Sequence, residues 1–205
     1  MYCILVTGIP AAGKSTMAKV MSEKLKLPVI SKDTIKELLF DNVGFQSRAE
    51  KVKLGIASME IMYYVAGQLM KAGQAFILEN NFEYSSEQGI KSLLEKYQYS
   101  VLTITLTGDY KVIYRRFLER ENSPDRHRGH VVNDSYPEKK ENNLKTPKAK
   151  TISCESFIRG IEQRGSDVFC VNGRQIKVDT TDFSRINMEE LFSQIEAWKE
   201  EILHD

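Results

Sequence analysis

Gly8-Ile9-Pro10-Ala11-Ala12-Gly13-Lys14-Ser15 is the most informative segment of this sequence. It fits the pattern G-x-x-x-x-G-K-[ST] of a phosphate-binding loop, in which glycines permit a tight wrap that points backbone N–H groups at phosphate oxygens. The positive end of the following helix and the charge of Lys14 add to the attraction, and the Ser15 hydroxyl suits Mg²⁺. We therefore expect a site for the triphosphate of ATP, or of a close relative, with Mg²⁺. The expected nucleotide contacts are Gly8, Pro10, Ala11, Ala12, Gly13, Lys14, Ser15 and Thr16.

The residues on either side of this loop predict a strand before it and a helix after it. Residues 2–7 form a short, almost wholly apolar run, typical of a strand buried on both faces, and we expect it to be the central strand of a parallel sheet. Apolar residues recur at helical spacing from Met17 to Leu25, and Pro28 forbids continuation. An ordinary glycine-containing turn is the alternative, but the four fixed positions would co-occur by chance in only about one per cent of chains this long.

Strands and helices are expected to alternate along the rest of the chain. The expected strands are 29–30, 75–78 and 100–106, with strand-like segments at 167–171 and 175–179 around the turn Asn172-Gly173; the expected helices are 47–72, 86–97, 109–121, 152–163 and 187–203. This alternation predicts an α/β fold with a three-layer, doubly wound, mainly parallel five-stranded sheet, whose ligands bind at the carboxyl ends of the strands. We expect residues 1–205 to form a single domain.

The segment from about residue 122 to 150 differs in composition from the rest. It has few apolar residues, three prolines and many basic groups. This composition predicts a mobile basic insertion, or lid, rather than a part of the core.

Composition excludes several classes of function. The chain has 205 residues and a net charge of +1, which excludes a global attraction to nucleic acid or to an anionic membrane. It contains no apolar run of the roughly 18 residues that span a bilayer, so we expect a cytoplasmic protein. Cys3, Cys154 and Cys170 are few and far apart, which favours reduced thiols that serve in packing.

Asp33 and Lys36 are the expected catalytic residues after the second strand. They belong to the run Ser31-Lys32-Asp33-Thr34-Ile35-Lys36. A carboxylate at the end of a strand beside the phosphate loop can accept the proton of an acceptor hydroxyl, and a cation one turn later can hold the γ-phosphate or an anionic group of the acceptor. The alternative role of Asp33 is to cap the helix that begins at Thr34.

Glu79 follows the third strand, where P-loop proteins place the acidic residue that holds the water shell of Mg²⁺. We expect Glu79 to contact the metal, together with Ser15, or alternatively to contact the acceptor. An ordinary polar loop formed by Glu79, Asn80 and Asn81 is the alternative.

Arg116 and Arg120 lie four residues apart, on one face of the helix that leads into the basic insertion. Guanidinium groups there could offset the charge of the transferred phosphoryl group, in a site whose closure excludes water. A solvated helix face is the alternative, above all for Arg115. His127 and His130 lack a neighbouring set of ligands and predict substrate contacts or solvated residues rather than a metal site.

Together these motifs resemble the polynucleotide-kinase-like branch of P-loop phosphotransferases, which also contains chloramphenicol phosphotransferase and the zeta-toxin kinases. The resemblance covers residues 2–130. It implies that Asp33 is the catalytic base toward the acceptor hydroxyl and that Lys36 contacts the reacting phosphate or the acceptor. It further implies that Arg116 and Arg120 belong to the nucleotide lid.

The sequence leaves three functions open. The first is an ATP-dependent kinase that phosphorylates a hydroxyl of a small molecule or of a nucleic-acid end, with Lys14, Asp33, Lys36, Arg116 and Arg120 as catalytic residues. The second is a nucleoside or nucleotide kinase, and the third is an ATP-binding switch that acts through the basic segment. We expect a monomer or homodimer without another stable protein partner.

Overall fold

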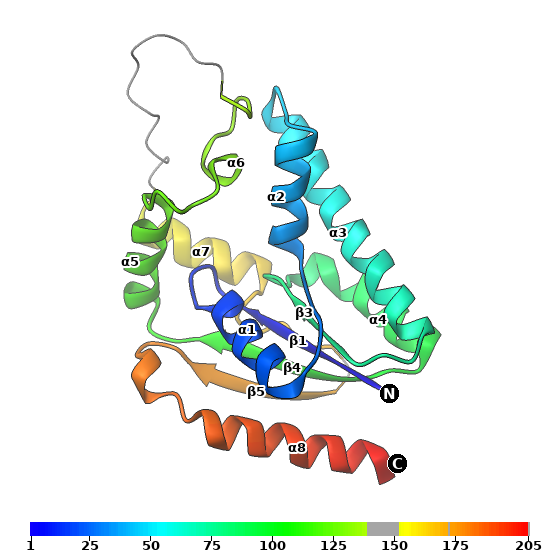
Figure 1. Ribbon diagram of the computed structural model, residues 1–205. Coiled ribbons are helices and arrows are strands. Elements are labelled where there is room, and N and C mark those ends of the chain that lie inside the picture. The colour runs from blue at the N-terminus through cyan, green and yellow to red at the C-terminus, as the bar shows by residue number, and fades with distance from the viewer. Residues whose placement is uncertain (139–151, 172, 205) are drawn as a thin grey trace.

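The computed structural model describes residues 1–138, 152–171 and 173–204 (Figure 1). Its centre is a five-stranded sheet in the order β2-β3-β1-β4-β5, in which all neighbouring strands are parallel. The strands are β1 (Tyr2–Gly8), β2 (Val29–Ser31), β3 (Phe76–Glu79), β4 (Ser100–Thr107) and β5 (Arg174–Asp179). The expected α/β fold is therefore confirmed, with β1 in the middle.

Helices connect the strands and cover the sheet. They are α1 (Lys14–Leu25), α2 (Lys32–Asn42), α3 (Arg48–Lys71), α4 (Glu87–Tyr97), α5 (Tyr110–Glu121), α6 (Arg128–Val131), α7 (Cys154–Arg164) and α8 (Met188–His204), with short 3₁₀ turns η1 (Tyr84–Ser86) and η2 (Phe183–Arg185). None of the helices in these described ranges is long and apolar enough to cross a membrane.

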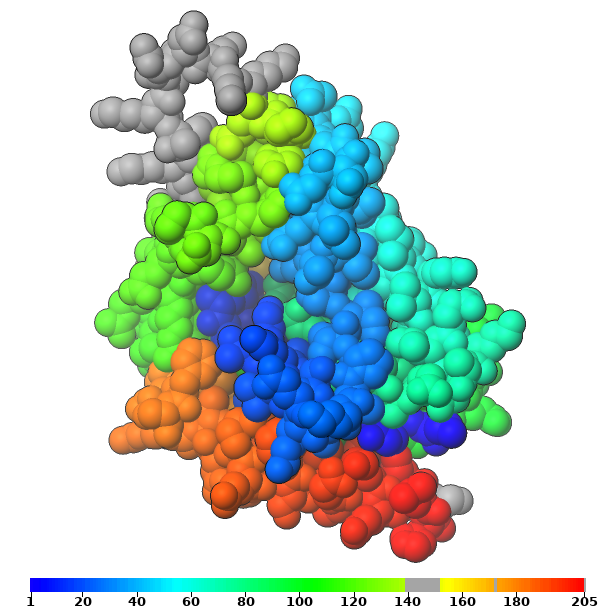
Figure 2. Space-filling view, viewed as in Figure 1, coloured from blue at the N-terminus to red at the C-terminus, as the bar shows by residue number. Residues whose placement is uncertain are grey.

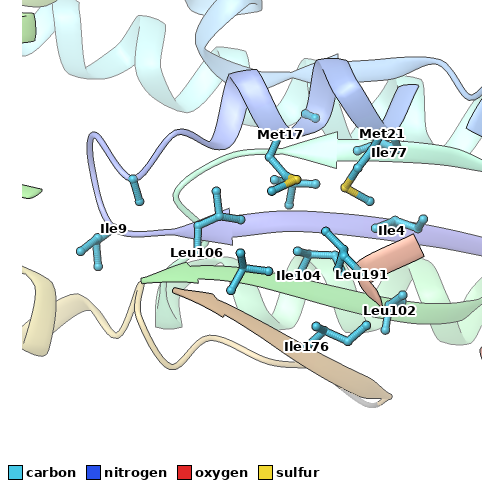
Figure 3. Packing of buried hydrophobic residues seen from close by; sticks show 14 of the residues in the cluster. Ile4, Ile9, Met17, Met21, Ile77, Leu102, Ile104, Leu106, Ile176 and Leu191 are labelled. Carbon is cyan, nitrogen blue, oxygen red and sulfur yellow. The ribbon is translucent and has the colours of Figure 1, made fainter. Parts of the chain in front are cut away.

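Two hydrophobic clusters, one on each face of the sheet, form the core. Successive strand residues point to opposite faces, so Ile4 packs with α1 and α8, whereas Leu5 packs with α3 and α4. On the first face Met17 and Met21 of α1 lie over the strands, as the close view shows (Figure 3). Because β1 needs apolar residues on both faces, its sequence is a continuous apolar run rather than an alternating one.

Residues 167–171 are not the strand that the sequence predicts. β5 pairs in parallel with β4, and a hairpin around Asn172-Gly173 would require antiparallel strands; position 172 itself lies outside the described residues. Phe169 is instead buried in the second cluster, where its ring stacks on Phe82 with centroids 5.4 Å apart. An apolar run thus serves here as core packing rather than as part of the sheet.

The first part of the expected lid is also better packed than the sequence predicts. Val132 is buried with Phe40 and Phe45 in a third cluster between this segment, α2 and α3. Tyr136 exchanges two backbone hydrogen bonds of 2.8 Å with Phe45. The segment 122–138 is therefore attached to the helices beside it, and residues 139–150 of the expected insertion lie outside the described part of the chain.

Candidate active site

A cavity of about 520 Å³ lies beyond the carboxyl ends of β1, β2 and β3. The surface is hollowed between α2, α5 and the phosphate loop (Figure 2). Its lining residues are Ala11, Gly13, Lys14, Ser15, Thr16, Lys32, Asp33, Lys36, Glu79, Asn81, Arg116, Arg120, Arg126, His130 and Phe183. All the predicted catalytic and metal-binding residues therefore line the same cavity. Of the predicted nucleotide contacts, Gly8, Pro10 and Ala12 do not line this cavity.

The phosphate loop depends on two glycines. Gly8 has φ +130°, and a Cβ added to it would lie 2.0 Å from the carbonyl oxygen of Leu106, so no other residue fits there. Gly13 has φ +86° directly before α1 begins at Lys14. The loop therefore ends at the amino end of a helix, whose free N–H groups suit phosphate oxygens.

Lys14 is buried within this loop. Its Nζ donates a hydrogen bond of 2.9 Å to the carbonyl oxygen of Ile9. Burial lowers the pKa of Lys14 to about 8, although the carboxylate of Glu79 acts in the opposite direction. The loop thus holds a cation that a bound polyphosphate would stabilise strongly.

Glu79 is the last residue of β3 and lies beside the loop. Ser31, its register partner on β2, donates a hydrogen bond of 2.5 Å from its hydroxyl to the Glu79 carboxylate. Burial raises the pKa of Glu79, with Lys14 and hydrogen bonds from Ser31 and Ser15 acting against the rise. The oxygen donors of Ser15 and Glu79 fit Mg²⁺, which proteins bind through one or two carboxylates together with phosphates of the substrate. Among the described residues, no cluster of three or more His, Cys, Asp or Glu forms a separate metal site.

Asp33 lies in the first turn of α2 and is not its cap. Ser31 is the cap, and its hydroxyl accepts a hydrogen bond of 3.5 Å from the backbone N–H of Thr34. Burial raises the pKa of Asp33, whereas nearby positive charges lower it, with the largest effect from Lys32 at 3.7 Å. The positive charges outweigh burial, so the pKa of Asp33 lies below its ordinary value. Asp33 is therefore ionised at neutral pH and faces the cavity.

Arg116 and Arg120 both face the cavity from α5, and exposed Arg115 does not. Arg116 donates hydrogen bonds to the carbonyl oxygens of Thr180 and Thr181, the second at 2.7 Å. These bonds hold the guanidinium group at the end of β5. Of these three arginines, only Arg115 therefore fits the alternative of a solvated helix face.

The two histidines are packed beside the cavity rather than solvated. His130 lines the cavity and its Nε2 lies 2.9 Å from a carboxylate oxygen of Glu37, while the Nε2 of His127 lies 3.0 Å from Asp41. Burial, followed by the nearby Arg126, lowers the pKa of His130 to about 3. His130 is therefore a neutral residue at physiological pH.

Phe183 is a site residue that the sequence did not point to. Its ring covers Gly13, and the centroid of the ring lies 4.3 Å from the guanidinium carbon of Arg116. It comes from η2, after the last strand, 170 positions beyond Gly13. No motif surrounds it, so only the folding of β5 beside β4 brings it to the loop.

A second cavity, of about 430 Å³, adjoins the first and shares Lys32, Lys36 and Asn81 with it. Its other walls come from α3 and from the segment after β3. Lys36, which was expected to contact a phosphate or the acceptor, thus lies at the junction of the two cavities.

Residues 4–144 match the AAA domain family, which is most of the chain. The protein belongs to the AAA domain family. No curated protein matches this AAA domain protein.

Several solved structures share the fold of this AAA domain protein. A candidate kinase from Chloroflexus aurantiacus is 24% identical with a TM-score of 0.71, and the match covers 96% of this chain and 94% of that one. A gluconokinase from Sinorhizobium meliloti is 12% identical with a TM-score of 0.56, covering 100% and 97% of the two chains. A shikimate kinase from Bacteroides thetaiotaomicron is 14% identical with a TM-score of 0.51, covering 98% of each chain. The AAA domain protein therefore has the fold of P-loop kinases.

Proposed function

We propose that this protein is an ATP-dependent phosphotransferase that moves the γ-phosphoryl group of ATP to an acceptor hydroxyl. The observation that carries the proposal is the pair of adjoining cavities. Lys32 and Lys36 line both of them, and Asp33 lies between these two residues in the chain and lines the first. A γ-phosphate beside the loop and a hydroxyl in the second cavity would therefore meet near the Asp33 carboxylate.

The side chains of the first cavity suit this transfer. Asp33 accepts the proton of the acceptor hydroxyl, whose oxygen bonds to the γ-phosphorus while the bond to the β–γ bridging oxygen breaks and ADP leaves. Its lowered pKa keeps Asp33 ionised for this role at neutral pH. Lys14, Arg116 and Arg120 offset the charge that spreads over the transferred oxygens. Mg²⁺, held through Ser15 and Glu79 with the phosphates, would add charge neutralisation.

A small-molecule acceptor is favoured over a nucleic-acid end. Kinases named for sugars, gluconate and shikimate share this fold, and the net charge of +1 offers no general attraction for a polyanion. Membership of the polynucleotide-kinase-like branch stays part of the proposal, and it rests on the resemblance of the sequence motifs that contain Asp33, Arg116 and Arg120. A cytoplasmic location and a monomer or homodimer without another stable protein partner stay predictions from the sequence.

A transfer screen with radiolabelled ATP over sugars, nucleosides, antibiotics and oligonucleotides with free 5′ ends tests the proposal. We expect label on a hydroxyl of one acceptor class. Asp33→Asn should remove most of the transfer and leave ATP binding intact, whereas Glu23→Gln, which changes the charge equally on an exposed part of α1, should have no effect.

Three results would count against the proposal. Full transfer by Asp33→Ala would mean that Asp33 is not the base. Label on a nucleotide's phosphate, without dependence on Asp33, would favour a nucleotide kinase. Slow hydrolysis without any phosphorylated acceptor would favour a nucleotide-dependent switch.

A further inference from the structure

The second cavity has two chemically different walls. Val52, Ile56 and Met59 of α3 contribute apolar groups on one side. Asn81 and Ser85, from the segment after β3, contribute polar groups on the other. A ligand with a short carbon skeleton and several polar groups matches this combination.

The cavity also collects positive charge. Its cationic lining residues are Lys32, Lys36, Arg48 and Lys51. Its acidic residues are Glu60 and Glu83, and Glu83 is already paired with Arg164 at 2.8 Å. The lining therefore carries an excess of cations, although the chain as a whole is almost neutral.

Lys51 does not contribute to ligand binding, because its ammonium group is fully used within the protein. Its Nζ donates to the carbonyl oxygens of His130 and Val132 and, at 3.3 Å, to the side chain of Asn133. These three bonds match the three donors of an ammonium group. Lys51 fastens the segment after α6 to α3.

Lys36 and Arg48 have donors to spare. A guanidinium offers five N–H groups, and with partners in the described part of the chain Arg48 uses one of them, in a side-chain hydrogen bond of 3.0 Å to Asn133. Within residues 1–138, 152–171 and 173–204, neither Lys36 nor Arg48 has a carboxylate oxygen within 4.0 Å. Burial, followed by repulsion from Lys32, lowers the pKa of Lys36 to about 8, so an anion beside it would relieve an existing cost.

Gly55 gives Lys36 its room. A Cβ added at Gly55 would meet only the end of the Lys36 side chain, at 3.6 Å. Gly55 is in the interior of α3 and has no unusual φ, so the backbone conformation does not require a glycine there. The absence of a side chain instead leaves space for the end of Lys36. The Lys36 ammonium therefore lies against α3, inside the second cavity and close to its junction with the first.

We infer that the acceptor is a small alcohol that also carries an anionic group, a carboxylate or a phosphate monoester, bound by Lys36 and Arg48. The inference rests on the proposed function, because the hydroxyl of the same molecule has to reach Asp33. A neutral sugar would leave both cations without an anionic partner among the described residues. A nucleic-acid end would need an extended positive surface, whereas these cations line a cavity of about 430 Å³.

Binding is tested first, without any turnover. The protein is saturated with Mg²⁺ and a non-hydrolysable ATP analogue, so that the phosphate loop is filled, and is titrated calorimetrically with glycerol, glycerate and glycerol 3-phosphate. These probes share a carbon skeleton and hydroxyls and differ in the anionic group. We expect saturable binding of glycerate or glycerol 3-phosphate and none of glycerol, and the better of the two anions identifies the anionic group.

Matched variants locate the binding. Arg48→Gln should weaken the binding of the anionic probe by about tenfold or more, as expected when a charge-assisted hydrogen bond is lost. Lys53→Gln removes the same charge from an exposed position of α3 outside this cavity and should leave the affinity unchanged. Anions that bind no better than glycerol, or equal losses in the two variants, would overturn the inference.

Transfer from radiolabelled ATP separates this inference from the proposed function. We expect label on anionic alcohols only, and a rise of about tenfold in the acceptor KM of Arg48→Gln with an unchanged KM for ATP. Equal labelling of neutral alcohols would overturn the anionic class and leave the kinase proposal standing. Anion binding without any labelled acceptor would overturn the proposed function, and the acceptor assignment with it.

Discussion

Lys14 has a lowered pKa because it is buried, and its ammonium group donates a hydrogen bond to the backbone carbonyl oxygen of Ile9. A triphosphate placed against it favours the charged form and therefore raises its pKa. Around pH 8.5 a large part of the Lys14 population is neutral in the empty site and has to take up a proton when ATP binds. Nucleotide affinity should accordingly fall as the pH rises through about 8, the value of the empty-site pKa.

Calorimetry in buffers of different ionisation enthalpy measures this proton uptake. We expect a fraction of a proton per ATP at about pH 8.5 and almost none at about pH 6.5, where Lys14 is already charged. Lys14→Arg should lose most of the uptake, since a guanidinium stays protonated at both pH values; Lys36, with its similar pKa of about 8, accounts for any remainder. Unchanged ATP affinity in Lys14→Ala would contradict the assignment of the phosphate loop.

Arg116 and Arg120 share one face of α5 and line the first cavity. Arg115 and Arg116 are neighbours in sequence, but the helix directs only Arg116 toward the cavity. We expect Arg116→Ala to weaken ATP binding by about tenfold through loss of charge-assisted contacts, and Arg115→Ala to leave it within about twofold. Titration with a fluorescent ATP analogue measures both.

Arg116 also holds the backbone at Thr180 and Thr181, so its loss could disturb the fold. Circular dichroism and Arg120→Ala provide the controls. Arg120 faces the same cavity and, among the described residues, forms an ion pair only with the adjacent Glu121, at 3.2 Å. Equal effects of Arg115→Ala and Arg120→Ala on ATP binding would contradict a specific role for this face.

Gly55 lies in the interior of α3, beside the second cavity. Glycine in a helix interior costs roughly 0.5–1 kcal/mol relative to alanine, and a Cβ at Gly55 meets only the flexible end of Lys36 at an ordinary contact distance. Gly55→Ala should therefore raise the free energy of unfolding by about that amount, as measured by urea denaturation. It should also weaken acceptor binding, because it narrows the second cavity. A destabilised protein would mean that the residue is needed for the conformation of α3.

At the scale of the whole molecule, Lys51 joins parts of the chain that are distant in sequence. Its ammonium group connects α3 with the carbonyl oxygens of His130 and Val132, about 80 residues later. Lys51→Met keeps the size of the side chain but leaves these carbonyl groups unsatisfied, at a cost of about 1–3 kcal/mol. Hydrogen exchange should then accelerate at residues 128–133, whereas Lys53→Met should leave it unchanged. Unaltered exchange in Lys51→Met would mean that the third cluster alone holds the segment.

Local patterns were enough to predict most elements and the position of the first cavity. The strands and helices follow from apolar spacing, and β1 is central because it is apolar on both faces. Lys14 and Asp33 follow β1 and β2, and Glu79 ends β3, which lies between these two parallel strands. Their convergence at one edge of the sheet could therefore be predicted from the order of elements alone.

Only the tertiary structure decided the remaining features, because each depends on contacts between residues far apart in the chain. Phe169 became core rather than strand because β5 takes the place beside β4. Phe183 reaches Gly13, and Lys51 reaches His130, across separations that no motif encodes. The second cavity likewise exists only where α3 meets the start of α2 and the segment after β3, so its excess of positive charge is invisible in a chain with a net charge of +1.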